Sequence, residues 1–125
     1  LSIEDQRLLY GEEQPASISN HGTCEARILE WGPQPATQQR KYKVILGADV
    51  VASLYDPVAL AETIHELSMP ETQVYISYKG RLDGPHERFE QRISELYQKV
   101  ERRLSPQSRN KNPGVYILYA TDPIF

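Results

Sequence analysis

Apolar side chains follow two kinds of pattern along the chain, and each of them predicts β-strands. Residues 24–30 and residues 74–79 alternate between apolar and polar side chains, which is typical of strands with one exposed face. Residues 43–51 and residues 115–120 are nearly continuous apolar runs, which predict strands buried on both faces, as in parallel sheets. The strand at 24–30 is therefore expected at an edge, and the strand at 43–51 inside a sheet.

Two helices are predicted between these strands. The first begins at Asp56, because aspartate is a good N-cap and Pro57 follows at the first helical position, where no N–H partner is lost. Apolar residues then recur at helical spacing as far as Leu67, and Pro70 is expected to end the helix. Asp-Gly-Pro at 83–85 is expected to start the second helix, again because an aspartate is followed by a proline.

The end of the second helix is ambiguous in the sequence. Its apolar stripe runs from Phe89 to Val100 at helical spacing. Residues 100–104 are compatible with a continued helix and also with a strand that follows a break near Gln98. A polar segment at 106–113 then predicts a turn.

Strands alternate with helices over most of this order, which predicts an α/β fold with a sheet covered by helices. The last strands are joined across a short turn. They are expected to form an antiparallel hairpin at one edge of the sheet, as mixed sheets commonly do.

Composition and charge narrow the classes of function. A chain of 125 residues is expected to form one domain, and its net charge of −3 gives no electrostatic case for binding nucleic acid or a membrane. No apolar stretch approaches the ~20 residues needed to span a bilayer. The single Cys24 excludes an intramolecular disulfide, and His21 and His86 lack the spacing of metal ligands, so no metal is assigned.

Two residues at predicted strand ends are candidates for a binding site. Asp49 lies at the carboxyl end of the apolar strand, and open α/β sheets bind ligands in the crevice at this end. Trp31, the only tryptophan, lies at the end of the strand predicted at 24–30. One pocket built from both is the functional interpretation. The structural alternatives are a core or loop-packing role for Trp31 and a turn-capping role for Asp49.

Three motifs carry a resemblance to a known family. Leu-Glu-Trp-Gly at 29–32, Ile-Leu-Gly-Ala-Asp-Val-Val at 45–51 and Val-Tyr-Ile-Ser-Tyr-Lys-Gly-Arg at 74–81 follow one another with a helix between the last two. Their order and spacing resemble the family-16 methyltransferases, which are S-adenosylmethionine-dependent enzymes with a Rossmann-like seven-β-strand sheet. Many of these enzymes methylate lysine side chains of proteins. The resemblance covers residues 21–120, and residues 1–20 are poorly defined.

The resemblance implies roles for three residues. Trp31 would lie beside the adenine of S-adenosyl-L-methionine, Ala48 would contact this cofactor, and Asp49 would act where the methyl group meets the substrate lysine. A flat indole is a good stacking partner for a purine. A carboxylate near a sulfonium and an incoming amine favours both cationic groups. The resemblance also implies a protein substrate as the partner. It implies a location of the enzyme in the cytoplasm, or in both the cytoplasm and the nucleus.

Three departures from the family pattern matter. Glu30 stands where the family has aspartate, and Ala52 stands where it has an aromatic residue that helps close the lysine channel. The glycine-rich cofactor loop is absent, because the seven glycines never occur close together. We therefore expect the chain to be a single partial domain, the C-terminal portion of such an enzyme, without the first two strands of the sheet.

The partial-domain hypothesis predicts how the strands pair. The strand that carries Asp49 should pair with the strand at 74–79, and the strand at 24–30 should lack its normal neighbours. Two further hypotheses remain open. The chain could be a non-catalytic remnant or protein-interaction module with the same fold, or a Rossmann-like domain with an unrelated ligand.

Overall fold

The structure is a computed structural model, and it describes residues 16–17, 22–35, 40–51, 56–80, 84–108 and 114–125. The chain divides into two compact units, which comprise residues 1–30 and residues 31–125. In the first unit, the short strands β1 (Ala16–Ser17) and β2 (Thr23–Cys24) pair antiparallel. The second unit contains β3 (Tyr42–Ala48), α2 (Pro57–Glu66), β4 (Ser68–Lys79), α3 (Pro85–Leu96), β5 (Tyr97–Leu104), a short 3₁₀ helix (Pro106–Ser108) and β6 (Val115–Pro123).

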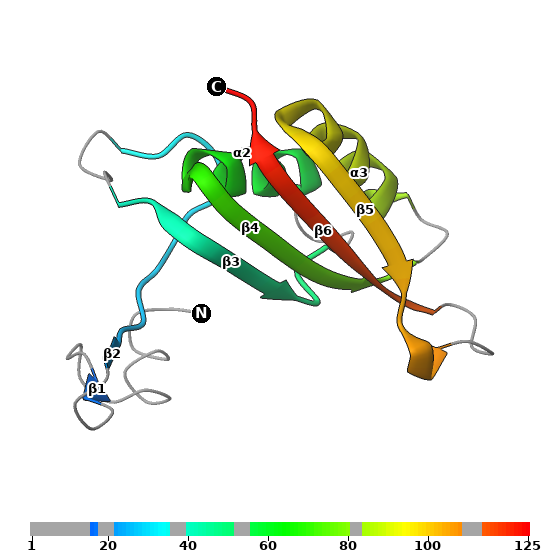
Figure 1. Cartoon of the computed structure of the whole chain (residues 1–125), viewed down its shortest axis with the longest axis horizontal. Helices are drawn as coiled ribbons and strands as arrows, with labels where there is room; N and C mark the ends of the chain where they lie inside the picture. Colours follow the sequence, from blue (N-terminus) through cyan, green and yellow to red (C-terminus); the bar gives the residue numbers. More distant parts are fainter. Residues whose placement is uncertain (1–15, 18–21, 36–39, 52–55, 81–83, 109–113) are drawn as a thin grey trace. The chain divides into compact units, whose positions relative to one another are not determined.

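The second unit is built around a mixed four-stranded sheet with the order β3-β4-β6-β5. Strands β3 and β4 are parallel, whereas β6 is antiparallel to both β4 and β5. Both helices lie on the same face of this sheet (Figure 1). Two predictions are confirmed: the strand that ends at Asp49 pairs with the strand that contains residues 74–79, and the last two strands form an antiparallel hairpin.

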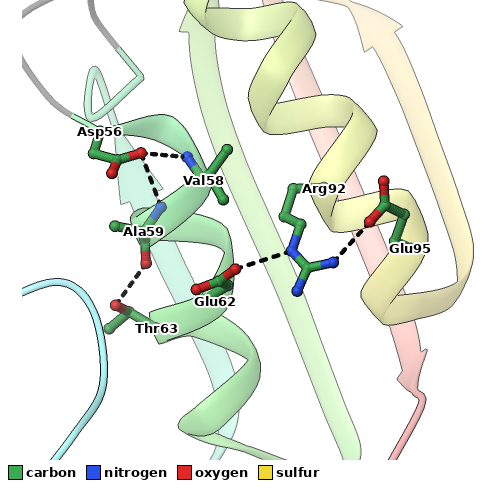
Figure 2. A network of polar contacts seen from close by, with 7 residues as sticks. All are labelled: Asp56, Val58, Ala59, Glu62, Thr63, Arg92 and Glu95. Carbon is green, nitrogen blue, oxygen red and sulfur yellow. Dashed lines mark hydrogen bonds and ion pairs between the residues drawn. The ribbon is translucent and has the colours of Figure 1, made fainter.

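Helix α2 begins as the sequence predicts. Oδ1 of Asp56 accepts hydrogen bonds from the backbone N–H groups of Val58 and Ala59, at 3.0 and 3.1 Å (Figure 2). The helix stops at Glu66 with Leu67 as its C-cap, within one residue of the predicted end. The predicted role of Pro70 was wrong, because this residue lies inside β4 and does not end the helix. The register between β3 and β4 is irregular at this place, and proline is tolerated in a strand at such irregularities because no regular ladder bond is lost there.

Helix α3 ends before residues 100–104, whose conformation the sequence left ambiguous, and these residues belong to a strand. Its first residue is Pro85, and the N-cap Gly84 has a φ of 87°, a left-handed conformation that suits glycine. Strand β5 begins at Tyr97, so Val100 belongs to β5 and not to the helix. Pairing with β6 along seven residues of β5 decides this conformation. Asp83 lies outside the described residues.

The core lies between the sheet and the two helices. Alternate residues of β4 and β6 point to the helices and are almost completely buried, and Phe89 and Ile93 of α3 pack against them. The buried strand residues are Val74, Ile76, Tyr78, Leu118 and Ala120. This alternation, together with the 3.6-residue period of α3, gives one contiguous apolar layer.

Three predictions about exposure and strands were wrong. Strand β6 is not buried on both faces, because Ile117 is 42% exposed. Strand β3 is not buried on both faces: it is the first strand of the four-stranded sheet, and Val44 and Leu46 are 51% and 73% exposed. The helices cover only the other face, so the apolar run of β3 remains half open within this unit. Residues 25–30 form no strand and are exposed, and only residues 23–24 of the predicted edge strand pair with another strand.

Candidate active site at the carboxyl end of β3

Asp49 directly follows the last residue of β3, at the carboxyl end of the parallel strand pair. Its backbone N–H donates a hydrogen bond of 3.0 Å to the carbonyl oxygen of Ser77 on β4. Its φ is 56°, in the left-handed region. Aspartate adopts this conformation more readily than most residues, but it is uncommon and is found where surrounding contacts impose it. The turn at Asp49 is therefore held in a defined conformation by β4.

The residues beside Asp49 lead the chain from the surface into the core. Ala48 is opposite Ser77 in the parallel ladder and is exposed, like Asp49 itself. Val51, two residues further, is only 6% exposed and belongs to the core. Ala48 and Asp49 are thus accessible at a strand end that is anchored on both sides. The sequence predicted that these two residues lie at the carboxyl end of a strand.

Trp31 is half-buried and packs against the core of the second unit. The backbone N–H of the next residue, Gly32, donates a 2.7 Å hydrogen bond to Oγ1 of Thr63 on α2. Thr63 in turn donates to the carbonyl oxygen of Ala59 at 2.7 Å (Figure 2). Thr63 lies about 10 Å along the helix from the N-cap, given a rise of 1.5 Å for each residue. The segment after Trp31 is therefore fixed to the second turn of α2.

The two predicted walls of the pocket are anchored toward different ends of β3. The carbonyl oxygen of Leu67, just past α2, accepts a 2.9 Å hydrogen bond from Tyr42 at the start of β3. The C-terminal half of α2, where Gly32 is bound, therefore lies toward the amino end of β3. Asp49 lies at its carboxyl end. The structure confirms no shared pocket for Trp31 and Asp49, and their roles remain predictions.

A family model described as lysine methyltransferase matches residues 13–96 of the chain. The chain belongs to this lysine methyltransferase family. The match includes Trp31, Ala48 and Asp49, and it ends at the last residue of α3. The mixed sheet with two helices is consistent with part of the Rossmann-like methyltransferase fold, and S-adenosylmethionine is the methyl donor that membership of the family implies.

This member of the lysine methyltransferase family has a cleft that the sequence did not predict. The cleft lies between the two helices and the segment after Trp31. Its volume is about 180 Å³. Figure 2 shows Arg92 of α3 between two carboxylates, Glu62 of α2 at 3.1 Å and Glu95 at 2.7 Å. The lining residues are Gly32, Pro33, Glu62, His65, Glu66, Arg92 and Leu96. Only the i, i+3 spacing of Arg92 and Glu95 was visible in the sequence.

The charges of this cleft are largely used within the protein. Glu66 accepts a 2.9 Å hydrogen bond from the backbone N–H of Gln34, and Nε2 of His65 lies 2.7 Å from the carbonyl oxygen of Ile124. Within the described ranges, no group of three or more His, Cys, Asp or Glu side chains could hold a metal ion. The polar side chains of the cleft are therefore mainly engaged with other groups of the protein. In the same ranges, no helix is long and apolar enough to cross a membrane.

A second polar cluster missed by sequence reasoning lies near the carboxyl end of β4. The hydroxyl of Tyr78, a residue that is 2% exposed, donates to Oε1 of Glu90 on α3. Nη1 of Arg102 on β5 donates to the same oxygen at 2.9 Å. Burial, with a further contribution from the Glu90 carboxylate, raises the pKa of Tyr78 well above its ordinary value. The shift extends the pH range in which the hydroxyl is a protonated donor further into the alkaline region.

Proposed function

We propose that this chain is part of an S-adenosylmethionine-dependent protein-lysine N-methyltransferase, and that Asp49 lies where the methyl group is transferred. The observation that carries the proposal is the conformation of Asp49. An exposed carboxylate in a left-handed turn, at the carboxyl end of a parallel strand, is anchored to β4 within a chain of the lysine methyltransferase family. Ligands of α/β sheets bind at this end of the strands.

The residues at this strand end fit the cationic part of the cofactor. S-adenosylmethionine supplies an electrophilic methyl group on a sulfonium. A carboxylate at residue 49 favours a positive charge beside it and can orient the lysine amine through a hydrogen bond. The small side chain of Ala48 leaves room for close approach. Because methyl transfer requires mainly alignment of the amine, methyl group and sulfur, a fixed turn at Asp49 would contribute to the rate.

The role of Trp31 as a partner of the adenine rests on the resemblance and on the chemistry of indole. Its indole is half-buried and packs against the core, which also suits a purely structural role. A binding measurement is therefore needed to decide between these two roles.

We further propose that a complete domain places another strand along the open edge of β3. The support is the apolar character of this edge strand, where Val44 and Leu46 are more than half exposed. Long exposed apolar edges are pairing sites, and folded proteins generally cover or interrupt them. Such a strand would bring the glycine-rich loop that the family uses to bind the methionine part of the cofactor. Without it, we expect the present chain to have little or no activity.

A second candidate function is a non-catalytic methyltransferase-like module that interacts with another protein. Ala52 favours it, since the family pattern has an aromatic residue at this position. Residue 52 lies outside the described residues, so the argument rests on the sequence alone. Binding of S-adenosylmethionine separates the two candidates.

Calorimetric titration of S-adenosylmethionine tests the proposal. The full-length protein should bind the cofactor, and Trp31→Ala should weaken binding by about tenfold, the loss expected for one aromatic stacking partner worth roughly 1.4 kcal/mol. Equal affinities of the two proteins would remove Trp31 from the cofactor site. Absence of any binding to the full-length protein would favour the non-catalytic module.

A further inference from the structure

Three elements meet at the carboxyl end of β4 through one carboxylate. Glu90 of α3 accepts hydrogen bonds from the hydroxyl of Tyr78 on β4 and from Arg102 on β5, the latter at 2.9 Å. Tyr78 is almost completely buried, so its hydroxyl has exchanged water for Glu90 and the neighbouring guanidinium of Arg102. A buried hydroxyl that loses its partner is costly. Glu90 therefore ties the end of β4 to the helix layer.

The residue that follows β4, Gly80, is held by side chains on the same face of the sheet, because Tyr116 is paired with Tyr78 in the antiparallel ladder. The guanidinium carbon of Arg102 lies 4.5 Å above the centre of the Tyr116 ring, a cation–π contact. The Tyr116 ring lies against Gly80, where an added Cβ atom would be 2.6 Å from the ring. The backbone N–H of Gly80 donates to the carbonyl oxygen of Gly114 at 3.1 Å. The end of β4 and the residue after it are thus held by one cluster on the helix-covered face.

The clamped segment is the one that anchors Asp49. Ser77, whose carbonyl oxygen accepts the hydrogen bond from the backbone N–H of Asp49, immediately precedes Tyr78. Ser77 is also paired with Ala48 in the parallel ladder. Asp49 is in the left-handed region, where its conformation depends on such neighbours. A shift of the end of β4 would therefore move the acceptor that holds the turn at Asp49.

We propose that Tyr78 and Glu90 are positioning residues, which fix the carboxyl end of β4 and through Ser77 hold the turn at Asp49. For the reaction itself, this role rests on the proposed function of Asp49. A separate structural consequence is that the hydroxyl of Tyr78 protects the hydrogen bond of the Asp49 backbone amide from opening.

A matched control is available at the opposite end of β4. Tyr97 is also buried, and its hydroxyl lies 2.5 Å from Oγ of Ser68, the first residue of β4. Tyr78→Phe and Tyr97→Phe each remove one buried hydroxyl and preserve the ring. Hydrogen exchange of backbone amides, followed by NMR on this chain, then compares the two variants at Asp49 and at Leu118 in the middle of the sheet.

Tyr78→Phe should accelerate exchange of the Asp49 amide about tenfold more than Tyr97→Phe does, the effect of one hydrogen bond on a local opening. The Leu118 amide should respond equally in both variants. Equal acceleration at Asp49 would overturn the proposal, because the loss would then be a general one. Glu90→Gln is the second variant: it retains an acceptor for Tyr78 and should accelerate exchange at Asp49 less than Tyr78→Phe.

Kinetics of the full-length protein separate this proposal from the proposed function. Tyr78→Phe should lower kcat several-fold and leave the KM for S-adenosylmethionine unchanged. An unchanged kcat, with faster exchange at Asp49, would contradict a role in positioning for the reaction. If the wild-type protein transfers no methyl group, the proposed function fails, and the exchange experiment still decides whether Tyr78 holds the turn.

Discussion

The two faces of the four-stranded sheet carry similar apolar side chains and differ in what covers them. On the face toward α2 and α3, Val74 and Leu118 have no exposed surface. On the opposite face, Leu46 and Ile117 are 73% and 42% exposed, and Tyr75 packs its ring on Tyr119 at 4.9 Å between centroids. Both helices lie on the first face (Figure 1).

This difference shows that an apolar pattern in a strand does not by itself tell whether both faces of that strand are buried. In this unit, the stability comes from the helix-covered face. The other face and the edge of β3 contribute little here, and under the proposed function they are the places where a further strand would add contacts. Four experiments probe the difference, beginning with the largest expected effect.

A pair of core and surface truncations tests the comparison directly. Phe89→Ala, on the covered side, should lower the free energy of unfolding by about 3–5 kcal/mol, because it removes a fully buried ring and leaves a cavity. Leu46→Ala, on the open face, should cost less than about 0.5 kcal/mol. Urea unfolding followed by circular dichroism measures both. A cost above about 1.5 kcal/mol for Leu46→Ala would mean that the open face is covered in solution.

Alkaline pH tests the burial of Tyr97, which contacts His65 of α2 edge-on. Burial raises the pKa of Tyr97 to about 12 from an ordinary value of 10. Because the folded state favours the neutral phenol, this contribution is complete below pH 10 and is lost as the pH rises toward 12. The loss is of the order of 2–3 kcal/mol. Tyr97→Phe should flatten this part of the stability profile, and an unchanged profile would contradict it.

The cap of α2 offers a smaller effect on the covered face. Asp56→Ala should lower the free energy of unfolding by about 1 kcal/mol, because two backbone N–H groups lose their acceptor. Asp56→Asn should restore most of the loss, since asparagine is an equally good N-cap. Thermal unfolding of the three proteins measures the difference. A loss as large in Asp56→Asn as in Asp56→Ala would show that the charge, and not the cap, matters.

The smallest effect is expected at the exposed ion pair between the helices. Glu62→Gln should leave the urea midpoint of unfolding within experimental error, because Arg92 retains Glu95 and both groups are accessible to solvent. As a control, the urea midpoints of the wild type and of Glu62→Gln are compared at low and at high salt. A clear shift of the midpoint that disappears at high salt would show that this pair holds the helix layer together.

Local signals in the sequence predicted much of the fold. The aspartate and proline that begin α2 act on neighbouring backbone groups, so they are readable without tertiary information. The alternation at 74–79 and the spacing of Phe89 and Ile93 reflect the periods of strand and helix, and they correctly identified the covered face.

The features that could not be predicted depend on residues far apart in the chain. The exposure of β3 follows from the position of the two helices, which cover only one face of the sheet. The strand at Tyr97–Leu104 follows from its pairing with β6. At the candidate site, the strand end predicted the position of Asp49. Its bond to Ser77 and the cluster around Glu90 join residues 12 or more positions apart, and no local pattern announces them.

Methyl transfer to protein lysine by the full-length protein tests the central claim about Asp49. Asp49→Asn is the suitable variant, because asparagine tolerates the left-handed backbone and loses only the charge. Asp122→Asn is its matched control, since Asp122 has a similar φ of 58° and lies at the end of β6. Asp49→Asn should reduce the rate by about 100-fold, and Asp122→Asn should retain it. A wild-type rate in Asp49→Asn would contradict the account.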